Sequence, residues 1–286
     1  MGICHDLNVD LHTHSSASDG VLSPENLVKR AANNKVDILA LTDHDSVAGI
    51  SEALEVSRST DLHFIPGVEI SVSWGGACIH LVGLDVDHEN TEFLGALLGI
   101  QTGRLERAKR IDESLQKEGL PSLLTAALDF SKNSGQVGRT HFARALTERG
   151  FCDSIQEVFS NYLVKGKPGY VEHLWPSLKD AMHWISQAGG TAVIAHPARY
   201  KTLGGHLSYL LEEFLSLGGS AIEVATGSHS SVDIRRFQSI ANEFGFDASR
   251  GSDFHCPNES RCDVGQAPNL PDGTMPIWNK WVGELI

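Results

Sequence analysis

The sequence predicts an α/β fold in which a TIM-like barrel is interrupted by a helical insertion. Three observations support this prediction. Short apolar segments alternate with amphipathic helical patterns over most of the 286 residues, which indicates parallel βαβ units. About seven such units are present, and this number favours a barrel over an open doubly wound sheet. Neither a GxGxxG motif nor a phosphate-binding loop follows the first apolar segment, which weakens the open-sheet nucleotide-binding alternative.

The expected elements of the barrel follow one another along the chain. Strands are predicted at 7–12, 37–41, 63–71, 78–84, 191–196, 221–225 and 246–254. A helix is predicted between the first two strands, with Ser23 as its N-cap and Pro24 at its first position. Two further amphipathic helices, at 176–190 and 231–245, end in glycine. Strand and helix therefore alternate as the predicted barrel requires.

One stretch, residues 91–166, breaks this alternation. It contains no convincing strand, and its apolar residues recur with the helical period. Helices are predicted at 104–119, 122–133, 138–150 and 154–166. The expected organisation is therefore a barrel domain made of residues 1–90 and 167–286, with residues 91–166 inserted between two strands as a substrate lid.

The composition limits the classes of function. Hydrophobic residues make up 41% and charged residues 21% of the chain, as in an ordinary globular protein with a sizeable core. The net charge of -13 argues against a general nucleic-acid or membrane-surface binder. The sequence lacks a long apolar run and its N-terminus lacks the pattern of a signal peptide. We expect a cytoplasmic location, no membrane association and no obligate protein partner.

Histidine and carboxylate residues recur along the predicted strands. Asp10, His12 and His14 alternate near the first strand, so their side chains point to one face. Later members of the set lie in, or just after, other predicted segments: Asp19, His44, Glu69, His80, His196, Asp253 and His255. A parallel barrel carries its active site at the C-terminal ends of its strands. We therefore expect these side chains to meet there.

Some of these residues have an ordinary structural interpretation when taken alone. His80 fits a hydrogen-bonded core histidine, and His196 before Pro197 can simply end a strand. Glu223 is interpreted as an interior carboxylate paired with a lysine or arginine. Taken together, however, so many buried imidazoles and carboxylates would be costly without cations, because unpaired buried charge is expensive. The sequence therefore predicts a metal centre.

The insertion differs in charge from the rest of the chain. Residues 101–144 hold eight basic residues, Lys132 among them, and five acidic ones. Arg104 and Arg107 share a helix face, and Arg139 and Thr140 stand at a predicted helix start, where backbone N–H groups favour an anion. The segment is therefore a candidate contact for an anionic substrate. The alternative is a solvated helix surface.

The chain resembles the PHP (polymerase and histidinol phosphatase) family in six segments that occur in the family's order: DLHTHSSASDG (10–20), LTDHD (41–45), GVEISV (67–72), IHLVGLDV (79–86), AVIAHP (192–197) and GSDFH (251–255). This resemblance covers nearly the whole chain. It implies a distorted (β/α)7 barrel that binds metals and hydrolyses phosphoesters. The insertion resembles the 3',5'-nucleoside bisphosphate phosphatase branch in GRLERAK (103–109), GRTHFAR (138–144) and YLVKGKPGYV (162–171).

Carried over residue by residue, the resemblance implies two or three divalent metal ions. The implied ligand sets are His12, His14, Glu69 and Asp253 for the first metal, Asp19, His44 and His255 for the second, and Glu69, His80 and His196 for a third. Several family members have histidine where Asp19 stands. The additional oxygen ligand favours Mn²⁺, with Fe²⁺ next, over Zn²⁺.

Two metals can clamp the attacking and leaving oxygens of a phosphoryl displacement, so no serine or cysteine nucleophile is needed. Asp253, His255 and Glu69 are expected to be catalytic, with His255 also contacting the scissile phosphate. Three further carboxylates are interpreted as groups that fix the tautomers of the ligating histidines: Asp10, Asp43 and Asp45.

The implied substrate is a small nucleotide, a nucleoside carrying 3'- and 5'-phosphates, and the products are a nucleoside 5'-phosphate and phosphate. Arg104, Arg107, Arg139 and Thr140 are the implied substrate contacts, since a guanidinium can bind phosphate bidentately. His141 is more simply read as a helix-surface histidine than as a contact.

Three alternatives remain open. The nearest is 5'-to-3' exonucleolytic trimming of short RNA at the same site, which a long basic groove would favour. A histidinol-phosphate phosphatase is less favoured because that branch is not expected to carry the insertion. A non-catalytic accessory domain would be expected to have lost ligands, whereas all nine matched positions are filled here.

Overall fold

The structure is a computed structural model that describes residues 7–131 and 134–282. Residues 1–6, 132–133 and 283–286 lie outside the described residues, and Lys132 of the predicted basic segment lies outside with them. Within the described ranges, none of the helices has the length and apolar character needed to cross a membrane.

Seven strands of the described chain form one mixed sheet, and their order in the sheet follows the sequence. Their bounds are Val9–Asp10 (β1), Ile38–Leu41 (β2), His63–Trp74 (β3), Ala77–Leu84 (β4), Thr191–Ile194 (β5), Ala221–Thr226 (β6) and Asp247–Gly251 (β7). Every predicted strand is therefore present, and the ends differ by a few residues.

The strand β4 departs from the predicted parallel arrangement. It runs antiparallel to both of its neighbours, whereas the other pairs in the sheet are parallel. The cause is a tight hairpin between β3 and β4, in which Gly75 and Gly76 both have positive φ angles, 55° and 75°. Two-residue loops of this kind join antiparallel strands directly and favour glycine. The expectation that all strands belong to βαβ units is therefore wrong for β4.

The two edges of the sheet approach each other and nearly close a barrel. The Leu11 N–H group donates to the Arg250 carbonyl at 3.0 Å, and the Asp253 N–H group donates to the His12 carbonyl at 2.8 Å. A side chain at Gly251 would overlap His12, so only glycine permits this approach. The TIM-like barrel predicted from the sequence is thus confirmed as a mixed, distorted one.

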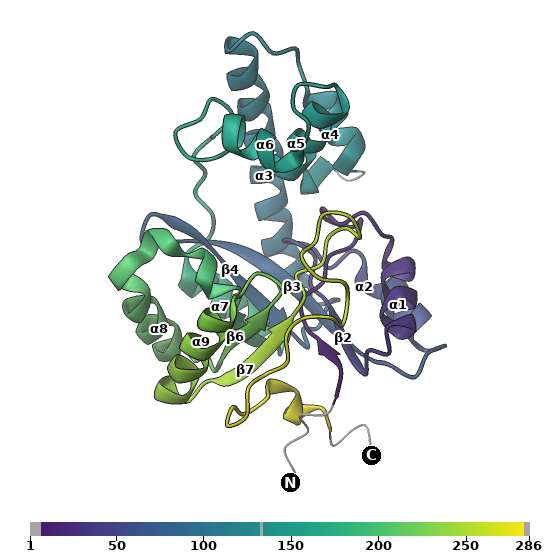
Figure 1. The fold of residues 1–286 in the computed structure, drawn as a ribbon, viewed down its shortest axis with the longest axis vertical. Helices are drawn as coiled ribbons and strands as arrows, with labels where there is room; N and C mark the ends of the chain where they lie inside the picture. Colours follow the sequence, from purple (N-terminus) through teal and green to yellow (C-terminus); the bar gives the residue numbers. More distant parts are fainter. Residues whose placement is uncertain (1–6, 132–133, 283–286) are drawn as a thin grey trace.

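Helices cover the outside of the barrel (Figure 1). Their bounds are Pro24–Asn33 (α1), Ile50–Ser57 (α2), Leu178–Gln187 (α7), Leu207–Ser216 (α8) and Ser231–Phe244 (α9), with short 3₁₀ turns at Pro197–Arg199 (η3) and Lys201–His206 (η4). The predicted cap of α1 is present, because the Ser23 hydroxyl accepts from the Asn26 N–H group at 3.2 Å. The helix α9 ends at Gly245, whose φ of 72° is favoured by glycine.

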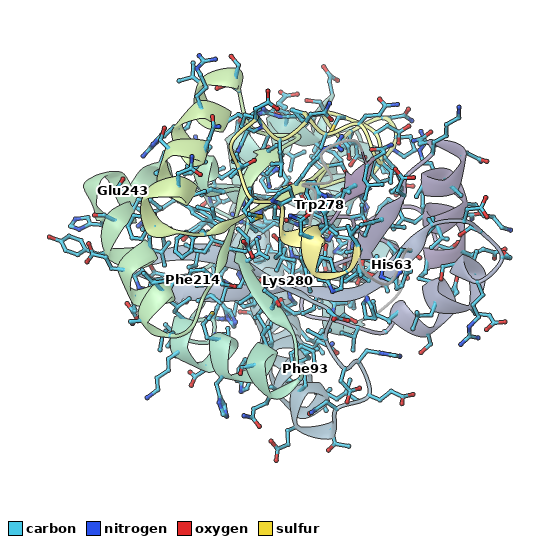
Figure 2. All side chains as sticks on the ribbon, turned by 90° about the horizontal axis from the view of Figure 1, so that it is seen from below. His63, Phe93, Phe214, Glu243, Trp278 and Lys280 are labelled. Carbon is cyan, nitrogen blue, oxygen red and sulfur yellow. The ribbon has the colours of Figure 1, made fainter. Side chains whose placement is uncertain are left out.

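One end of the barrel is closed by the 3₁₀ turn Ile277–Lys280 (η5). Figure 2 views this end: Trp278 lies near the middle, and Glu243 lies on the outer helix α9. Ala248 of β7 donates its N–H group to the Met275 carbonyl at 2.7 Å, which ties the turn to the sheet. The opposite end of the barrel faces the helical segment (Figure 1).

The described residues between β4 and β5 that precede α7 are helical or irregular. Helical bounds are Thr91–Lys117 (α3), Leu124–Ser131 (α4), Ser134–Gln136 (η1), Arg139–Glu148 (α5), Ile155–Val158 (α6) and the π-helical Phe159–Leu163 (η2). The long helix α3 joins two separate hydrophobic clusters: Phe93 and Ile100 pack with the barrel, whereas Ala108 and Leu115 pack with α4 and α5. Figure 1 shows α4, α5 and α6 grouped around the far part of α3.

Candidate active site

Nine side chains that the sequence singled out as metal ligands converge at the barrel end that faces the insertion. They come from β3 and β4 or from the loops after β1, β2, β5 and β7: His12, His14, Asp19, His44, Glu69, His80, His196, Asp253 and His255. Each belongs to at least one group whose nitrogen and oxygen atoms lie within 4.8 Å of one another. The chain thus brings all nine predicted ligands together.

Glu69 lies at the centre of this cluster and is fully buried. Its Oε1 atom is 2.8 Å from His80 Nδ1 and 2.9 Å from His196 Nε2. Its Oε2 atom is 2.9 Å from His44 Nδ1. A carboxylate with imidazoles close to both oxygens is placed to bridge two cations.

The remaining predicted ligands surround Glu69 on two sides. His14 Nε2 lies 3.4 Å from both Glu69 Oε2 and Asp253 Oδ1. On the other side, His255 Nε2 lies 3.2 Å from Asp19 Oδ1. The rings of His14 and His255 stack with their centroids 4.0 Å apart, so the two sides are contiguous.

The atoms fall into four possible groups of donors rather than three. These are His14, Asp19, His44 and His255; His12, His14 and Asp253; His12, Glu69 and His196; and His44, Glu69 and His80. The first contains the implied second set together with His14, and the second contains the first set without Glu69. The implied third set is divided, because His80 and His196 group with Glu69 separately. Glu69 is the member that these two groups share.

Several buried atoms of the cluster lack a hydrogen-bond partner among the described residues. They are His12 Nε2, both ring nitrogens of His14, Asp19 Oδ1, His44 Nδ1, Glu69 Oε2 and His196 Nδ1. Some of these atoms lie close to each other, but the angles between them do not allow hydrogen bonds. Burying polar atoms without partners costs roughly 1–3 kcal/mol each. Imidazole nitrogens and carboxylate oxygens are donors for divalent transition metals, so the residues present fit a bound metal centre.

The electrostatics of the cluster also favour added positive charge. Burial alone would raise the pKa of Glu69, yet His80, His44 and His12 hold it well below the usual range. Burial lowers the pKa of His80, but the charge of Glu69 and the hydrogen bonds to Cys78 and Glu69 together raise it to about 10. The carboxylate of Glu69 thus favours positive charge on the neighbouring His80. Divalent cations supply such charge in place of a proton when they bind.

Glu223 contributes to this cluster in a way that sequence analysis missed. Its Oε1 atom lies 2.7 Å from His12 Nδ1, and its Oε2 atom accepts the backbone N–H group of His196. The prediction that Glu223 pairs with a lysine or arginine is therefore wrong. With Nδ1–H donating to Glu223, the Nε2 atom of His12 faces the metal donors.

Within the described residues, the three aspartates interpreted as tautomer-fixing groups make no hydrogen bond to a histidine ring. Asp10 accepts from the Ser252 and Gly265 N–H groups at 2.8 and 2.7 Å. Asp43 accepts from the N–H and hydroxyl groups of Ser15 at 2.7 and 2.6 Å. These carboxylates fix the loops that carry the ligands, and the earlier interpretation is wrong for them. Asp45 has a different partner, an arginine.

Two of the predicted ligands have strained backbones. His196 and Asp253 have φ angles of 28° and 55°, and both are non-glycine residues in the left-handed region. Such conformations cost about 1–3 kcal/mol each and persist where the surrounding structure imposes them. Here each one directs a ligand inward from the end of a strand. Nothing in the local sequence signals this strain.

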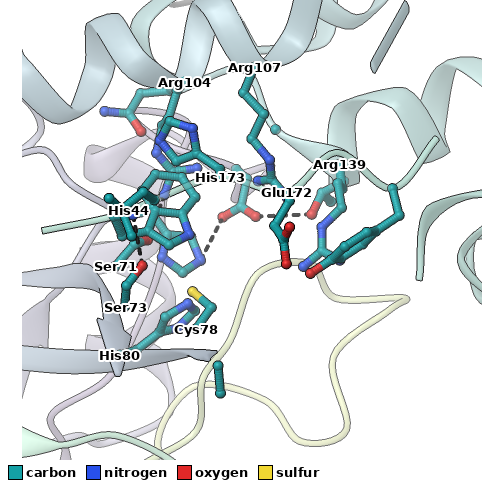
Figure 3. A pocket seen from close by; sticks show the side chains of 18 of the residues that line it. His44, Ser71, Ser73, Cys78, His80, Arg104, Arg107, Arg139, Glu172 and His173 are labelled. Carbon is teal, nitrogen blue, oxygen red and sulfur yellow. Dashed lines mark hydrogen bonds and ion pairs between the residues drawn. The ribbon is translucent and has the colours of Figure 1, made fainter. Parts of the chain in front are cut away.

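A cavity of about 680 Å³ opens beside the cluster (Figure 3). Asp19, His44 and His80 line its floor, and Arg104, Arg107 and Arg139 line the side formed by the insertion. Figure 3 shows the three arginines projecting from the helical segment toward the space above His80. The cavity therefore joins the metal donors to the predicted substrate contacts.

The three arginines differ in their partners. Arg104 pairs with the fully buried Asp45, its Nε atom lying 2.7 Å from Asp45 Oδ2. Asp45 was predicted to orient a histidine, which is wrong. Arg107 Nε and Arg139 Nη1 donate only to the Val171 and Leu163 carbonyls, at 3.2 and 3.1 Å. Within the described residues, neither has an acidic partner.

Arg107 and Arg139 are therefore not paired with a carboxylate of the described residues, although the exposed Glu172 lines the same cavity. Burial and the neighbouring charges of Arg139 and Arg104 lower the pKa of Arg107 to about 10. An anion placed between Arg107 and Arg139 would remove this repulsion. Guanidinium groups are suited to phosphate because they can donate two parallel hydrogen bonds.

Aromatic rings that sequence analysis did not single out hold these arginines. The Arg104 and Arg107 guanidinium carbons lie 4.8 and 5.5 Å from the centre of the Trp175 ring. The Arg139 guanidinium carbon lies 5.8 Å from the centre of the Phe159 ring. Cation–π contacts of this kind orient a charge without neutralising it.

Arg139 and Thr140 begin the helix α5, as predicted, but Thr140 and the next residue, His141, make unexpected contacts. The Thr140 hydroxyl donates to Asp19 Oδ2 at 3.2 Å, so it orients a metal donor. His141 is buried, and its Nδ1 atom accepts from the Gly138 N–H group at 3.0 Å. The expectation of a surface histidine is therefore wrong, because α5 packs His141 inward toward the cavity.

A second residue missed in the sequence is Arg199, in the turn after His196. Its Nη2 atom pairs with Asp253 Oδ2, on the side of the cluster away from the three arginines. The two residues are 54 positions apart. Only its closeness to the AVIAHP segment could have drawn attention to it.

Comparison with known proteins places this geometry in context. A family model described as "PHP domain" matches residues 10–172. The chain is 44% identical to a 3',5'-nucleoside bisphosphate phosphatase of Chromobacterium violaceum over 279 residues, 98% of each chain. It is 41% identical to the 5'-3' exoribonuclease Rnm of Escherichia coli over 276 residues, 95% of this chain and 93% of the relative.

A solved structure gives the same fold. An amidohydrolase from Chromobacterium violaceum, with bound sulfate and no metal, superposes with a TM-score of 0.92 at 44% identity. The match covers 96% of each chain, so it includes both the barrel and the helical segment.

Proposed function

Because this chain belongs to the PHP domain family, we propose that it is a metal-dependent phosphomonoesterase that removes the 3'-phosphate from nucleoside 3',5'-bisphosphates. The products are a nucleoside 5'-phosphate and inorganic phosphate. The activity named for the 44% identical relative supports this substrate. The observation that carries the proposal is the single cavity shared by metal donors and two unpaired arginines.

The nine convergent donors would hold two or three divalent ions. Glu69 would contribute to more than one ion, and the other donors would be two aspartates, Asp19 and Asp253, and six histidines. We propose Mn²⁺ first, with Fe²⁺ or Zn²⁺ as alternatives, because three of the donors are carboxylates. Such ions, when bound, lower the pKa of water and stabilise the charge that develops on phosphoryl oxygens.

The chain's own residues position the substrate. Arg107 and Arg139 bind the 5'-phosphate that is not cleaved, and Arg104 is held by Asp45 with its remaining nitrogen near the same cavity. The 3'-phosphate then lies over the donors that line the cavity floor. Holding both ends of the nucleotide supplies the orientation that displacement at phosphorus requires.

At the scissile phosphate, a water oxygen bonds to phosphorus as the bond to the 3'-oxygen breaks, and that oxygen leaves with a proton. His255 is proposed to contact this phosphate. Its Nδ1 atom lies 3.0 Å from the Asp253 carbonyl, so its Nε2 atom faces the cluster and Asp19. Asp253, His255 and Glu69 are the proposed catalytic residues.

The division into a barrel of residues 1–90 and 167–286 and an inserted substrate lid of residues 91–166 is also a proposal. Separate hydrophobic clusters support it. The segment reaches the cluster through polar contacts, such as that between Thr140 and Asp19. The cytoplasmic location, the small-nucleotide substrate and the lack of an obligate protein partner remain predictions.

A substrate panel tests the proposal. Purified protein loaded with Mn²⁺ is compared on adenosine 3',5'-bisphosphate, a 5'-phosphorylated trinucleotide, histidinol phosphate and p-nitrophenyl phosphate. We expect the bisphosphate to have the highest kcat/KM, with adenosine 5'-phosphate as product. Preference for the trinucleotide would favour the exoribonuclease alternative, and preference for histidinol phosphate would contradict the branch assignment. A protein that binds no metal would favour an accessory domain.

A further inference from the structure

The insertion contacts one of the predicted metal donors, Asp19, through two residues of the helix α5. The Thr140 hydroxyl donates to Asp19 Oδ2 at 3.2 Å, and Arg144 Nη1 donates to the Asp19 carbonyl at 2.9 Å. Thr140 and Arg144 are four positions apart, so their side chains lie on one face of the helix. Asp19 is thus held, at its side chain and its backbone, by residues 121 and 125 positions away in the sequence.

These contacts leave the other carboxylate oxygen of Asp19 directed toward the metal donors. Its Oδ1 atom lies 3.2 Å from His255 Nε2 and 4.0 Å from His44 Nε2. With His14, these three residues form one of the four possible groups of donors. In the described part of the chain, the hydrogen bonds that Asp19 accepts from outside this group both come from α5. The orientation of this donor therefore depends on the insertion.

Arg144 also reaches the loop that carries His255. Its Nη2 atom lies 3.2 Å from Glu259 Oε2, and Glu259 follows His255 by four positions. The Arg144 side chain is only 9% exposed, so this pair differs from an exposed ion pair, which contributes little. Unlike Arg107 and Arg139, Arg144 does not line the cavity beside the metal donors. Arg144 is therefore placed to hold two donor-bearing loops and not to bind the substrate.

We propose that α5 completes one metal site of the barrel, with Arg144 as its main positioning residue and Thr140 as the second. The inference rests on the proposed function in one respect, which is that the nine donors bind metal. It gives the insertion a role beyond that of a substrate lid. Contacts that orient a ligand without touching the metal contribute to metal affinity, so loss of the α5 contacts weakens an ion that α5 does not itself ligate.

The same helix thereby links the substrate to the metal centre. It begins at Arg139, which is proposed to bind the phosphate that is not cleaved, and it reaches Asp19 within its next five residues. One rigid element thus carries a substrate contact and the contacts that position a metal donor. The metal centre is fully formed only when the insertion lies against the barrel as it does in this structure.

Binding of Mn²⁺ to the full-length protein tests the inference without a substrate. A titration followed by electron paramagnetic resonance gives the number of bound ions and their affinities. Arg144→Met keeps the apolar stem and removes both donors, whereas Arg144→Lys keeps one donor, which is enough for a carbonyl. Thr140→Val removes the hydroxyl, and Thr140→Ser keeps it. The control is Arg149→Met, an exposed arginine at the end of α5 that donates to the Ser122 carbonyl at 3.2 Å.

We expect Arg144→Met and Thr140→Val each to weaken one Mn²⁺ ion about tenfold to a hundredfold and to leave the other ions within about twofold. Arg144→Lys and Thr140→Ser should stay within about threefold of the wild type, because each keeps a donor for Asp19. Arg149→Met should bind Mn²⁺ as the wild type does. Recovery in the conservative variants is the decisive readout, since a loss caused by altered packing would not follow the donor.

Three results for the variants would overturn the inference. Unchanged Mn²⁺ binding in Arg144→Met would mean that this arginine does not position Asp19. An equal weakening of every bound ion would identify general damage to the fold. Losses in Arg144→Lys and Thr140→Ser as large as those in Arg144→Met and Thr140→Val would mean that the hydrogen bonds are not what holds Asp19.

The wild-type protein separates this inference from the proposed function. Wild-type protein that binds no Mn²⁺ would overturn both. Wild-type protein that binds Mn²⁺ but does not hydrolyse adenosine 3',5'-bisphosphate would overturn the proposed substrate alone, because the ion counts of the variants decide the role of α5 independently of the reaction.

Discussion

Glu223 Oε1 lies 2.7 Å from His12 Nδ1, and both side chains are fully buried at the centre of the barrel. The carboxylate accepts the Nδ1–H group, so His12 presents Nε2 toward Glu69 and Asp253. This contact fixes the tautomer and the ring orientation of a proposed metal ligand without touching the metal itself.

Replacing Glu223 with alanine should therefore weaken metal binding. Loss of a carboxylate that orients a ligating histidine typically costs about 10- to 100-fold in metal affinity. We expect this loss in Mn²⁺ titration calorimetry, with far-ultraviolet circular dichroism unchanged. Glu243→Ala, on the exposed side of α9, is the matched control. Unaltered Mn²⁺ affinity in Glu223→Ala would show that His12 is oriented by other contacts.

Because Glu69 is proposed to bridge two metals, its substitution should have a larger effect on metal binding than that of Glu223. Both of its oxygens lie within 2.9 Å of imidazole nitrogens. Glu69→Gln should lose at least one metal per chain, counted by elemental analysis, and nearly all bisphosphate hydrolysis. The fold should persist, because the site lies at the end of the barrel. A fully active variant with its whole metal complement would contradict the bridge.

A substitution of His80 distinguishes a metal ligand from a histidine that supports the core. The side chain is 23% exposed and Nδ1 faces Glu69, so it does not fill the apolar core. His80→Asn should lower metal content and leave the free energy of unfolding of the metal-free protein within about 1 kcal/mol. A drop in stability with normal metal content would instead identify a structural histidine.

These cases show how far the sequence predicts the site. Ligand positions could be found because strand ends are visible as apolar runs that finish in histidine or carboxylate, as at His44 and His196. The side chain with which each of these residues pairs could not be predicted. Glu223 and His12 are 211 residues apart, and nothing along the chain says which strands will face each other across the barrel.

For the fold, too, the positions of the elements were predictable from the sequence, but not all of their arrangement. Apolar runs located every strand, but the direction of β4 depended on a two-residue turn. The Gly75–Gly76 pair is a local signal for a hairpin, whereas the alternation of strands and helices along the rest of the chain favours parallel strands. The positive φ angles of His196 and Asp253 had no signal, since tertiary contacts impose them.

Replacing Arg104 should lower the stability of the protein, whereas replacing Arg107 should not. Its partner Asp45 is fully buried and also accepts from the Ser71 N–H group at 2.8 Å. Arg104→Ala would leave that charge uncompensated, which costs about 3–5 kcal/mol. We expect this loss in urea unfolding, whereas Arg107→Ala should change stability little and raise KM for the bisphosphate. Equal stability of the two variants would contradict a structural role for the pair.

The last prediction concerns Arg139, which is proposed to grip the phosphate that is not cleaved. Arg139→Lys keeps the charge but removes the planar fork that binds phosphate bidentately. One lost charged hydrogen bond costs roughly 1.5–3 kcal/mol, or about tenfold to a hundredfold in kcat/KM. We expect this loss for adenosine 3',5'-bisphosphate but little change for p-nitrophenyl phosphate, which has no second phosphate. The ratio of the two rates is the measurement, because general damage to the metal centre lowers both and cancels. If the two rates fall in equal proportion, Arg139 supports the chemistry or the fold, and the second phosphate is held by other residues.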